Sequence, residues 1–297
     1  FIYGFSGTLS LSTDAISQAF HEVHPSIALF VLILFMAGLG FKLSFVPFHF
    51  WTPDVYQEAP SSVTAFLSTV PKIAVFAFFL QTLPVWQAAN ADFIYIIVAT
   101  AIASMLLGNI LAVFQDNAKR LMAFSSIGHT GFILMLFALP SEFIFQSLFF
   151  YLIVYSIANM GVFMSLQSIE DAFGITRLSQ MSGLGKKVPF LGALITILMV
   201  SLIGLPPTAG FIAKFRVFTE IIAFDSLMPY HYGLLVVAVI TTVISLYYYF
   251  KIPLHLFLKN ESSQVSEKSV SVDLLILVVL MVVFVVFYGV FPDFIKL

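Results

Sequence analysis

The chain of 297 residues is 60% hydrophobic and only 9% charged, with a mean hydropathy of +1.04. A soluble domain carries about 25% charged residues, because water must solvate its surface. The composition therefore excludes a soluble globular protein and indicates a surface covered by a lipid bilayer. The net charge of −2 gives no indication of a nucleic-acid partner. The chain has no cysteine, which excludes disulfides, cysteine-ligated zinc and thiolate-bound iron–sulfur clusters.

The first residues lack an initiator Met and a basic segment, and they lead directly into Ser6 and Gly7. This pattern is typical of the end of a helix that begins upstream, and not of a signal peptide. We therefore expect an N-terminally truncated fragment, in which residues 1–24 form the extracytoplasmic tail of a missing helix and its loop.

Long apolar stretches dominate the rest of the chain. A bilayer core of roughly 30 Å requires about 20 apolar residues in a helix. Eight stretches reach that length and predict an all-α, polytopic transmembrane helix bundle. In chain order they are 25–46, 61–83, 92–114, 120–139, 143–168, 188–221, 232–257 and 273–291. The sixth holds about 34 residues, too many for one straight crossing, and Pro206-Pro207 in its middle predicts a break.

The positions of Lys and Arg predict which loops face the cytoplasm. The loops at 47–60, 115–119, 169–187 and 258–272, with the adjoining helix ends, carry most of the basic residues outside the apolar stretches. These residues are Lys119, Arg120, Arg177, Lys186, Lys187, Lys251, Lys259 and Lys268, whereas the opposite loops carry Lys296 alone. Cytoplasmic loops are enriched in Lys and Arg, so we expect this set to be cytoplasmic and both chain ends to be extracytoplasmic.

The remaining basic residues fall inside apolar stretches and are Lys42, Lys72, Lys214 and Arg216. A charge at bilayer depth costs from ~2.5 to more than 10 kcal/mol, which makes such residues functional candidates. Arg216 lies near enough to a helix end to reach the headgroups. Desolvation allows a buried lysine, unlike an arginine, to lose its proton near neutral pH. The three lysines therefore predict a proton relay, against the alternative that they snorkel to the interface.

The carboxylates lie in loops or near helix ends, and Glu220 is the acid that falls within a span, close to its end. No acid in the sequence is an evident partner for Lys42 or Lys72. We expect their counter-charge in missing upstream helices or in another chain. For Lys214, an ion pair with Glu220 is the alternative to a relay role.

Proline accompanies two of these lysines. Lys42 precedes Pro47 by five residues, and Lys214 follows Pro206-Pro207. The predicted topology gives the two helices opposite directions, which is what an inverted repeat produces. A broken helix frees backbone carbonyls that are tolerated only in protein or beside a hydrated cavity. The pairing of proline with lysine therefore favours a transport path.

One histidine, His129, lies in the middle of a predicted helix. It is either a further relay residue or a hydrogen-bonding residue of helix packing. His49 lies among aromatic residues near the expected cytoplasmic interface. The sequence contains no metal-ligand cluster and no pair of histidines suited to haem.

Three motifs resemble subunit N of bacterial NADH:quinone oxidoreductase, the respiratory complex I, whose mitochondrial homologue is subunit 2. They are GFKLSFVPFHFWTPDVY at 40–56, AKRLMAFSSI at 118–127 and GLPPTAGFIAKF at 204–215. In the related subunits L and M and in cation/proton antiporters, the first motif usually ends Pro-Asp-Ala rather than Pro-Asp-Val-Tyr. Glu58 stands where the family usually has glycine.

The resemblance implies an antiporter-like fold of two inverted five-helix repeats. It assigns 25–83 to the last two helices of the first repeat, 92–257 to a complete second repeat and 273–297 to a C-terminal transmembrane helix. The proton-path lysines of the family match Lys42, Lys72 and Lys214.

The function that the resemblance implies is proton translocation in the bacterial inner membrane, driven by quinone reduction elsewhere in the complex. The chain would contact other membrane subunits and carry no redox chemistry, because NADH, FMN, iron–sulfur clusters and quinone belong to other subunits. Two alternatives stay open. One is a stand-alone cation/proton antiporter, and the other is a non-conducting scaffold whose buried lysines pair between chains.

Overall fold

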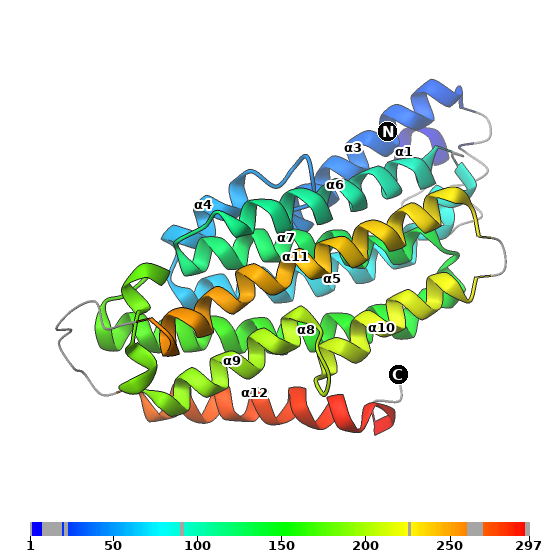
Figure 1. Cartoon of the computed structure of the whole chain (residues 1–297). Coiled ribbons are helices and arrows are strands. Elements are labelled where there is room, and N and C mark those ends of the chain that lie inside the picture. The colour runs from blue at the N-terminus through cyan, green and yellow to red at the C-terminus, as the bar shows by residue number, and fades with distance from the viewer. Residues whose placement is uncertain are drawn as a thin grey trace.

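The computed structural model describes residues 2–7, 20, 23–89, 92–224, 227–259 and 270–294 of the chain. These residues form helices and no β-strand, which confirms the predicted all-α class. The helices are α1 (Ile2–Ser6), α3 (Pro25–Leu43), α4 (Trp51–Glu58), α5 (Ser61–Ala89), α6 (Phe93–Val113), α7 (Ala118–Leu134), α8 (Ser141–Phe173), α9 (Pro189–Ile203), α10 (Ala209–Ile222), α11 (Pro229–Phe257) and α12 (Val272–Val290). Short 3-10 turns are η1 (Met135–Ala138), η2 (Leu178–Met181), η3 (Leu184–Lys186) and η4 (Pro292–Phe294). Figure 1 shows an elongated bundle in which the long helices run side by side.

The lengths of the helices suit a membrane. Within the described ranges, seven helices are long and apolar enough to cross a bilayer, and α9 is a shorter apolar helix. Helices α9 and α10 follow one another along the bundle and together make the eighth crossing (Figure 1). The eight predicted stretches and the break in the sixth are therefore confirmed. The expected tail at 1–24 lies largely outside the described residues.

Several predicted bounds shift by a few residues, and two differences from the sequence prediction are larger. Helix α5 continues through Pro84 to Ala89 instead of ending at residue 83. Proline removes one helix hydrogen bond. The last turn of α5 is stabilised by packing on α3, because the ring centres of Trp86 and Phe35 lie 4.4 Å apart. The second difference is α4, which lies inside the segment 47–60 that was expected to be a loop and includes Glu58 as its last residue.

Helix α7 lies at the centre of the bundle, and every residue of it except Arg120 is buried. It packs closely on α6 because both helices carry glycine at their contact. A Cβ atom on Gly131 would lie 2.6 Å from the Met105 backbone nitrogen of α6, closer than real Cβ contacts allow. Small residues at such a contact let helix backbones approach each other in membranes.

Residues 44–50, here called the first break, separate α3 from α4. Its backbone is supported by neighbouring helices: Val46 N–H donates to Ser104 Oγ of α6 at 2.9 Å, and the Leu43 carbonyl accepts from Thr130 Oγ1 of α7 at 3.0 Å. Ser44 takes the left-handed conformation with φ 62°. These bonds satisfy the condition under which an interrupted helix is tolerated at membrane depth.

Residues 204–208, the second break, separate α9 from α10. Here Lys214 Nζ donates to the Ile203 carbonyl at 2.7 Å. Gly210 at the start of α10 lies directly against α9, since a Cβ there would overlap the Ser201 carbonyl oxygen. Both breaks contain a cis peptide bond before proline.

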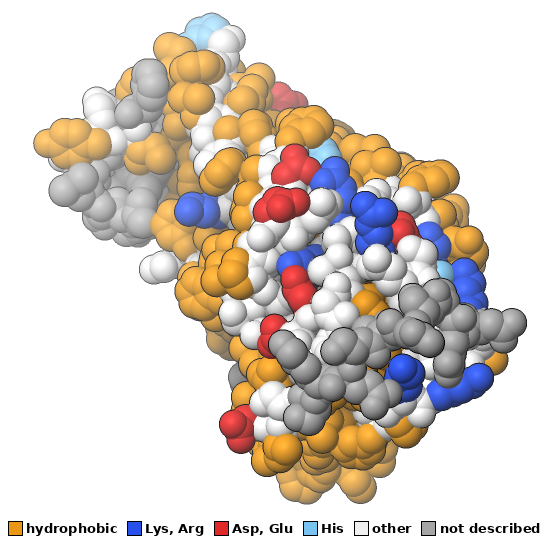
Figure 2. All heavy atoms as spheres, turned by 90° about the vertical axis from the view of Figure 1, so that its left-hand side faces the viewer, with side chains coloured by type: hydrophobic (Ala, Val, Ile, Leu, Met, Phe, Trp, Pro, Cys, Tyr) orange, Lys and Arg blue, Asp and Glu red, His pale blue; other side chains and the backbone are white. Residues whose placement is uncertain are grey.

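Charged residues gather at one end of the bundle, shown facing the viewer in Figure 2. Lys119 pairs with Glu170 at 3.3 Å, and Arg120 pairs with Asp54 at 2.5 Å. These pairs join the ends of α4, α7 and α8, and Lys251 from α11 donates to the Val113 carbonyl at the same end. The predicted clustering of basic residues is confirmed for those described, and the cytoplasmic orientation of this end stays a prediction.

Candidate functional site

The centre of the bundle contains a row of polar side chains on α7. Ser125, Ser126, His129 and Thr130 are all buried, although α7 is surrounded by apolar helices. Residues three and four apart lie on one helix face, so the spacing of this row brings three hydroxyls and the imidazole to neighbouring helices. Buried polar groups require hydrogen-bond partners, and these partners define the site.

Lys72 of α5 reaches this row from one side and is only 1% exposed. Its Nζ donates to Ser126 Oγ at 2.7 Å, to the Ser126 carbonyl at 3.0 Å and to Thr130 Oγ1 at 2.7 Å. Nζ also lies 5.9 Å from the centre of the Tyr155 ring. Hydrogen bonds to neutral groups therefore hold this lysine, and none of the ion pairs among the described residues includes it.

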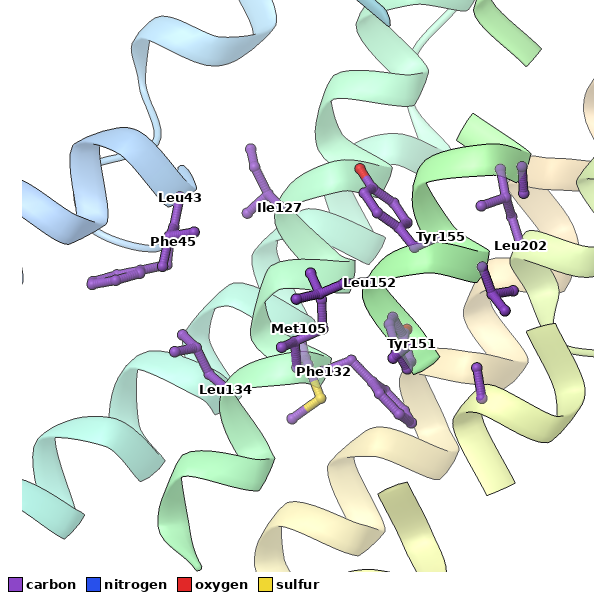
Figure 3. Close-up of a cluster of buried hydrophobic side chains, with 14 of the residues drawn as sticks. Leu43, Phe45, Met105, Ile127, Phe132, Leu134, Tyr151, Leu152, Tyr155 and Leu202 are labelled. Carbon is purple, nitrogen blue, oxygen red and sulfur yellow. The ribbon is translucent and has the colours of Figure 1, made fainter. Parts of the chain in front are cut away.

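Tyr155 of α8 connects Lys72 with His129. Its hydroxyl donates to Ser126 Oγ at 2.9 Å, and its ring centre lies 4.9 Å from that of His129. Figure 3 shows Tyr155 and Tyr151 on α8 in the buried cluster that also contains Phe132 and Leu202. Tyr155 and His129 are in contact through their rings, with no hydrogen bond between them. Further hydrogen bonds run from the two ring nitrogens of His129.

His129 lies between two tyrosines from different helices. Its Nδ1 is 2.8 Å from Tyr151 Oη of α8, and its Nε2 is 2.9 Å from Tyr249 Oη of α11. Tyr249 Oη also forms a short hydrogen bond with Ser125 Oγ. A neutral imidazole donates through one nitrogen and accepts through the other. A change of tautomer would therefore reverse both tyrosine hydrogen bonds, as transfer of a proton across the ring requires.

Lys214 of α10 approaches the row from the opposite side and is 8% exposed. Besides its hydrogen bond to the Ile203 carbonyl, its Nζ lies 5.4 Å from the Phe132 ring centre. The carbonyl of Ile203 is free to accept because α9 ends there. Lys214 therefore contacts the second break directly, whereas Lys72 reaches the first break through Thr130.

Two small cavities adjoin Lys214, His129 and Tyr151. Each has a volume of about 10 Å³, near the smallest space that holds one water molecule. The first is also lined by polar residues of α6 and α11, namely Asn109, Thr241, Thr242, Ser245 and Tyr248. A water molecule in these cavities would find enough polar partners to connect Lys214 with His129.

The structure brings together Lys72, His129 and Lys214 but leaves Lys42 apart. Lys42 is exposed in the last turn of α3. Glu220 Oε1 accepts from Ser147 Oγ at 2.7 Å, and Lys214 donates to a carbonyl. The ion pair between Lys214 and Glu220, which the sequence offers as the alternative to a relay role, is therefore not formed between these two described residues.

Two further sequence candidates have other roles. Arg216 is half-buried, with its guanidinium 4.3 Å from the Phe150 ring centre, so an aromatic contact holds it. His49 is buried in the first break, and its ring lies 4.5 Å from that of Phe50. Neither residue contacts the polar row.

Sequence reasoning missed the groups that join the lysines to the histidine: Ser126, Thr130, Tyr151, Tyr155 and Tyr249. Each lies in an apolar stretch where serine, threonine and tyrosine are common, so residue type alone does not distinguish them. The four-residue spacing of Ser126 with Thr130 and of Ser125 with His129 is the signal that could have indicated a polar face on one helix. In the described part of the chain, no group of three His, Asp or Glu side chains is placed to hold a metal ion.

Buried lysines beside a polar row, with two broken helices flanking them, are features of membrane proteins that carry ions or protons. A family model described as NADH:quinone oxidoreductase/Mrp antiporter, transmembrane, matches residues 1–245. The chain therefore belongs to this antiporter-like family. With its membrane spans and its bacterial relatives, it is a multi-pass protein of the inner membrane.

Similarity to curated relatives confirms the resemblance to subunit N. NADH-quinone oxidoreductase subunit N 2 of Chloroherpeton thalassium is 38% identical, over 98% of this chain and 58% of the relative. Subunit N of Chlorobium chlorochromatii is 39% identical, over 90% of this chain and 53% of the relative. Subunit N of Cytophaga hutchinsonii is 36% identical, over 98% of this chain and 62% of the relative. The chain thus spans between 53% and 62% of the length of these relatives.

Solved structures show the same fold. A chain of respiratory complex I from Thermus thermophilus with bound aureothin is 31% identical, with a TM-score of 0.76 over 98% of this chain and 62% of that one. A chain of the Mrp complex from Dietzia sp. DQ12-45-1b has a TM-score of 0.83 at 21% identity, over 99% and 61%. The second similarity concerns the fold alone.

Proposed function

We propose that the chain is the proton-translocating part of a membrane-arm subunit of NADH:quinone oxidoreductase. Protons would move through a buried lysine relay, driven by quinone reduction elsewhere in the complex. The observation that carries this proposal is the position of Lys72 and Lys214. Both are buried, neither forms an ion pair within the described ranges, and His129 lies between them on the central helix.

Each residue has a distinct role in the proposed relay. Lys72 gives a proton to Ser126 Oγ while the Ser126 hydroxyl passes its own proton to Tyr155 Oη, for which the hydrogen bond from Tyr155 to Ser126 reverses. Tyr155 then passes its own proton to a water molecule in the second cavity, which Tyr155 and His129 both line, and this water carries it to His129. His129 passes a proton between its two tyrosine partners by a change of tautomer. Lys214 receives it across the small cavities, through a water molecule. Lysine suits this task because its charged form is disfavoured by burial and can be released.

Lys42 is proposed as a relay residue on the family resemblance and on its position beside the first break. It lies on the exposed surface of α3, one residue before Leu43. An exposed lysine at membrane depth requires a counter-charge or protein contact. We propose that this comes from other parts of the complex, whose membrane subunits would be the partners of the chain.

The proposed organisation has 25–83 as the last two helices of a first repeat, 92–257 as a second repeat of five helices and 273–297 as a C-terminal helix. In support, the two broken helices, α3–α4 and α9–α10, occur one in each proposed repeat. NADH, FMN, iron–sulfur clusters and quinone are proposed to bind other subunits. The lack of cysteine supports this for the clusters, which require thiolate ligands.

Two other functions are less well supported. A stand-alone cation/proton antiporter shares the fold, as the similarity to the Mrp complex indicates. The relatives of higher identity, however, are named as oxidoreductase subunits N. A scaffold would use its buried lysines for ion pairs between chains. Lys72 does not fit this role, because it is enclosed within the chain by three hydrogen bonds.

Substitution of Lys72 tests the proposal. Lys72→Met keeps the length of the side chain but removes the proton carrier, so proton pumping by the assembled complex should fall at least about tenfold, the scale expected when a proton-transfer group is lost. The measurement is proton uptake in membrane vesicles during NADH oxidation. Lys186→Met, at an exposed lysine of η3, is the matched control and should pump normally. Normal pumping and assembly of Lys72→Met would rule out the relay.

A further inference from the structure

The ammonium group of Lys72 has a complete set of acceptors. An ammonium carries three N–H donors and no acceptor. The three oxygens around Nζ are those of the Ser126 carbonyl, the Ser126 hydroxyl and the Thr130 hydroxyl, at 3.0, 2.7 and 2.7 Å. This environment matches the charged lysine, because a neutral amine has only two N–H donors, so at most two of the three oxygens can accept from it.

The hydroxyl of Thr130 is the member of this set that also contacts the first break. Its single hydrogen has two acceptors within reach, the Leu43 carbonyl of α3 and the Ser126 carbonyl of α7, both at 3.0 Å. The Ser126 carbonyl already accepts the helix bond from Thr130 N–H and the bond from Lys72. A carbonyl oxygen has two lone pairs. With Lys72 charged, the Thr130 hydrogen is therefore directed to Leu43.

Loss of the proton from Lys72 changes this balance. The amine then makes one N–H bond fewer, and the Ser126 carbonyl can be left with a free lone pair. Threonine in a helix readily donates to the carbonyl four residues before it, so the Thr130 hydroxyl can turn from Leu43 to Ser126. We propose that Thr130 is a positioning residue that couples the protonation state of Lys72 to the hydrogen bonding of the first break.

The charge of Lys72 has no carboxylate beside it among the described residues, so the coupling acts through hydrogen bonds. The ionisable groups near Lys72 on the helices packed around it include Tyr155 of α8 and His129 of α7, and Tyr56 of α4 lies near Tyr155 and Ser126. Lys42 of α3 is exposed, and α6 has no charged residue. The carboxylates Asp54 and Glu170 are paired at the charged end of the bundle. No described carboxylate offsets the charge of Lys72, so its protonation acts directly on the oxygens that hold it.

The consequence concerns Lys42, because Leu43 is the next residue in the chain. With Lys72 charged, the end of α3 is tied to α7. With Lys72 neutral, the Leu43 carbonyl is released, and the first break, with Lys42 beside it, is free to rearrange. The inference rests on the proposed relay, since it assigns two protonation states to Lys72. It adds a route by which the protonation state of Lys72 controls the position of Lys42.

Hydrogen exchange of the assembled complex tests this coupling without turnover. The probe is the backbone amides of 44–50, among which Val46 donates to Ser104 and Phe48 to Phe45. Lys72→Met and Thr130→Val should each accelerate exchange there by about fivefold, the change expected for one hydrogen bond. Thr130→Ser keeps the hydroxyl and should exchange like wild type. The double variant should be no faster than Thr130→Val, because both changes remove the same bond.

Lys214→Met is the matched control. It removes the bond to Ile203, so it should accelerate exchange at 204–208 and leave 44–50 unchanged. Additive effects of Lys72→Met and Thr130→Val, or no effect of Lys72→Met at 44–50, would overturn the coupling. If Thr130→Val does not assemble, the comparison of Lys72→Met with Thr130→Ser decides the question. Normal pumping by Lys72→Met would instead overturn the proposed relay, so the two failures are distinguishable.

Discussion

The two buried lysines differ in how completely they are hydrogen-bonded. Lys72 has three protein acceptors, whereas the hydrogen bond found for Lys214 goes to one carbonyl, next to cavities large enough for about one water molecule each. An ammonium without a full set of protein acceptors keeps its charge by binding water. In the proposed relay we therefore expect Lys214 to exchange protons with water, and Lys72 to keep its charge through hydrogen bonds to the protein.

Tyr249 is expected to matter through its bond to His129. Tyr249→Phe removes the hydroxyl that joins Nε2 of the histidine to Ser125 and leaves the ring in place. Proton pumping should fall by about threefold to tenfold, the effect of one lost hydrogen bond in a buried network. The measurement is the pumping rate in vesicles with assembly checked. Tyr247→Phe, at a position 63% exposed on the same helix, is the control. Equal rates for the two variants would exclude Tyr249 from the path.

Lys72 and Lys214 could be predicted as candidates because a charged residue within an apolar stretch is visible in the sequence. The sequence did not indicate Thr130, because a threonine in a membrane helix is ordinary and its importance depends on a carbonyl 87 positions away in the chain. For Lys214 the sequence leaves an ion pair with Glu220 open, although residues six apart lie about 120° apart around a helix and not on one face. In the structure the two side chains have different partners.

The break between α9 and α10 is easier to predict from the sequence than the break between α3 and α4. The sixth stretch was too long for one crossing and contained two prolines, so its division into α9 and α10 followed from length. The first break was less evident. The stretch ending at residue 46 is long enough for a full crossing, and the sequence predicts a loop where the amphipathic α4 lies. Only packing against α7, through Arg120 and Asp54, shows that α4 belongs to the bundle.

The contact between α6 and α7 gives a prediction about packing. Gly131→Ala places a Cβ against the backbone of Met105 and should destabilise the bundle by about 1–3 kcal/mol, as overpacking does. Gly233→Ala in α11 meets no atom within 4 Å and should be neutral or stabilising by about 0.5–1 kcal/mol, because alanine is the better helix former. The readout is the thermal stability of the purified complex. A Gly131→Ala variant as stable as Gly233→Ala would show that the helices are not in close contact.

The whole molecule has an electrical asymmetry that predicts its orientation. Gln180 is exposed at the end of the bundle that carries the basic residues, and Ala223 is exposed at the opposite end. A single cysteine at Gln180, in this cysteine-free chain, should react with an impermeant reagent only from the cytoplasmic side. A cysteine at Ala223 should react only from the other side. Labelling of Gln180→Cys in right-side-out vesicles would show that the orientation is the reverse of the predicted one.

The proposed function requires the bundle to move protons through lysines that lose and regain charge inside the membrane. The most direct measurement is the number of protons pumped per NADH oxidised by complexes that carry Lys214→Arg or Lys214→Ala. Arginine keeps the positive charge and can still bond the Ile203 carbonyl, but it does not deprotonate in a protein. The relay predicts that Lys214→Arg pumps as poorly as Lys214→Ala, with both variants assembled. Pumping of Lys214→Arg at the wild-type ratio would contradict it and would leave Lys214 as a structural charge that supports the second break.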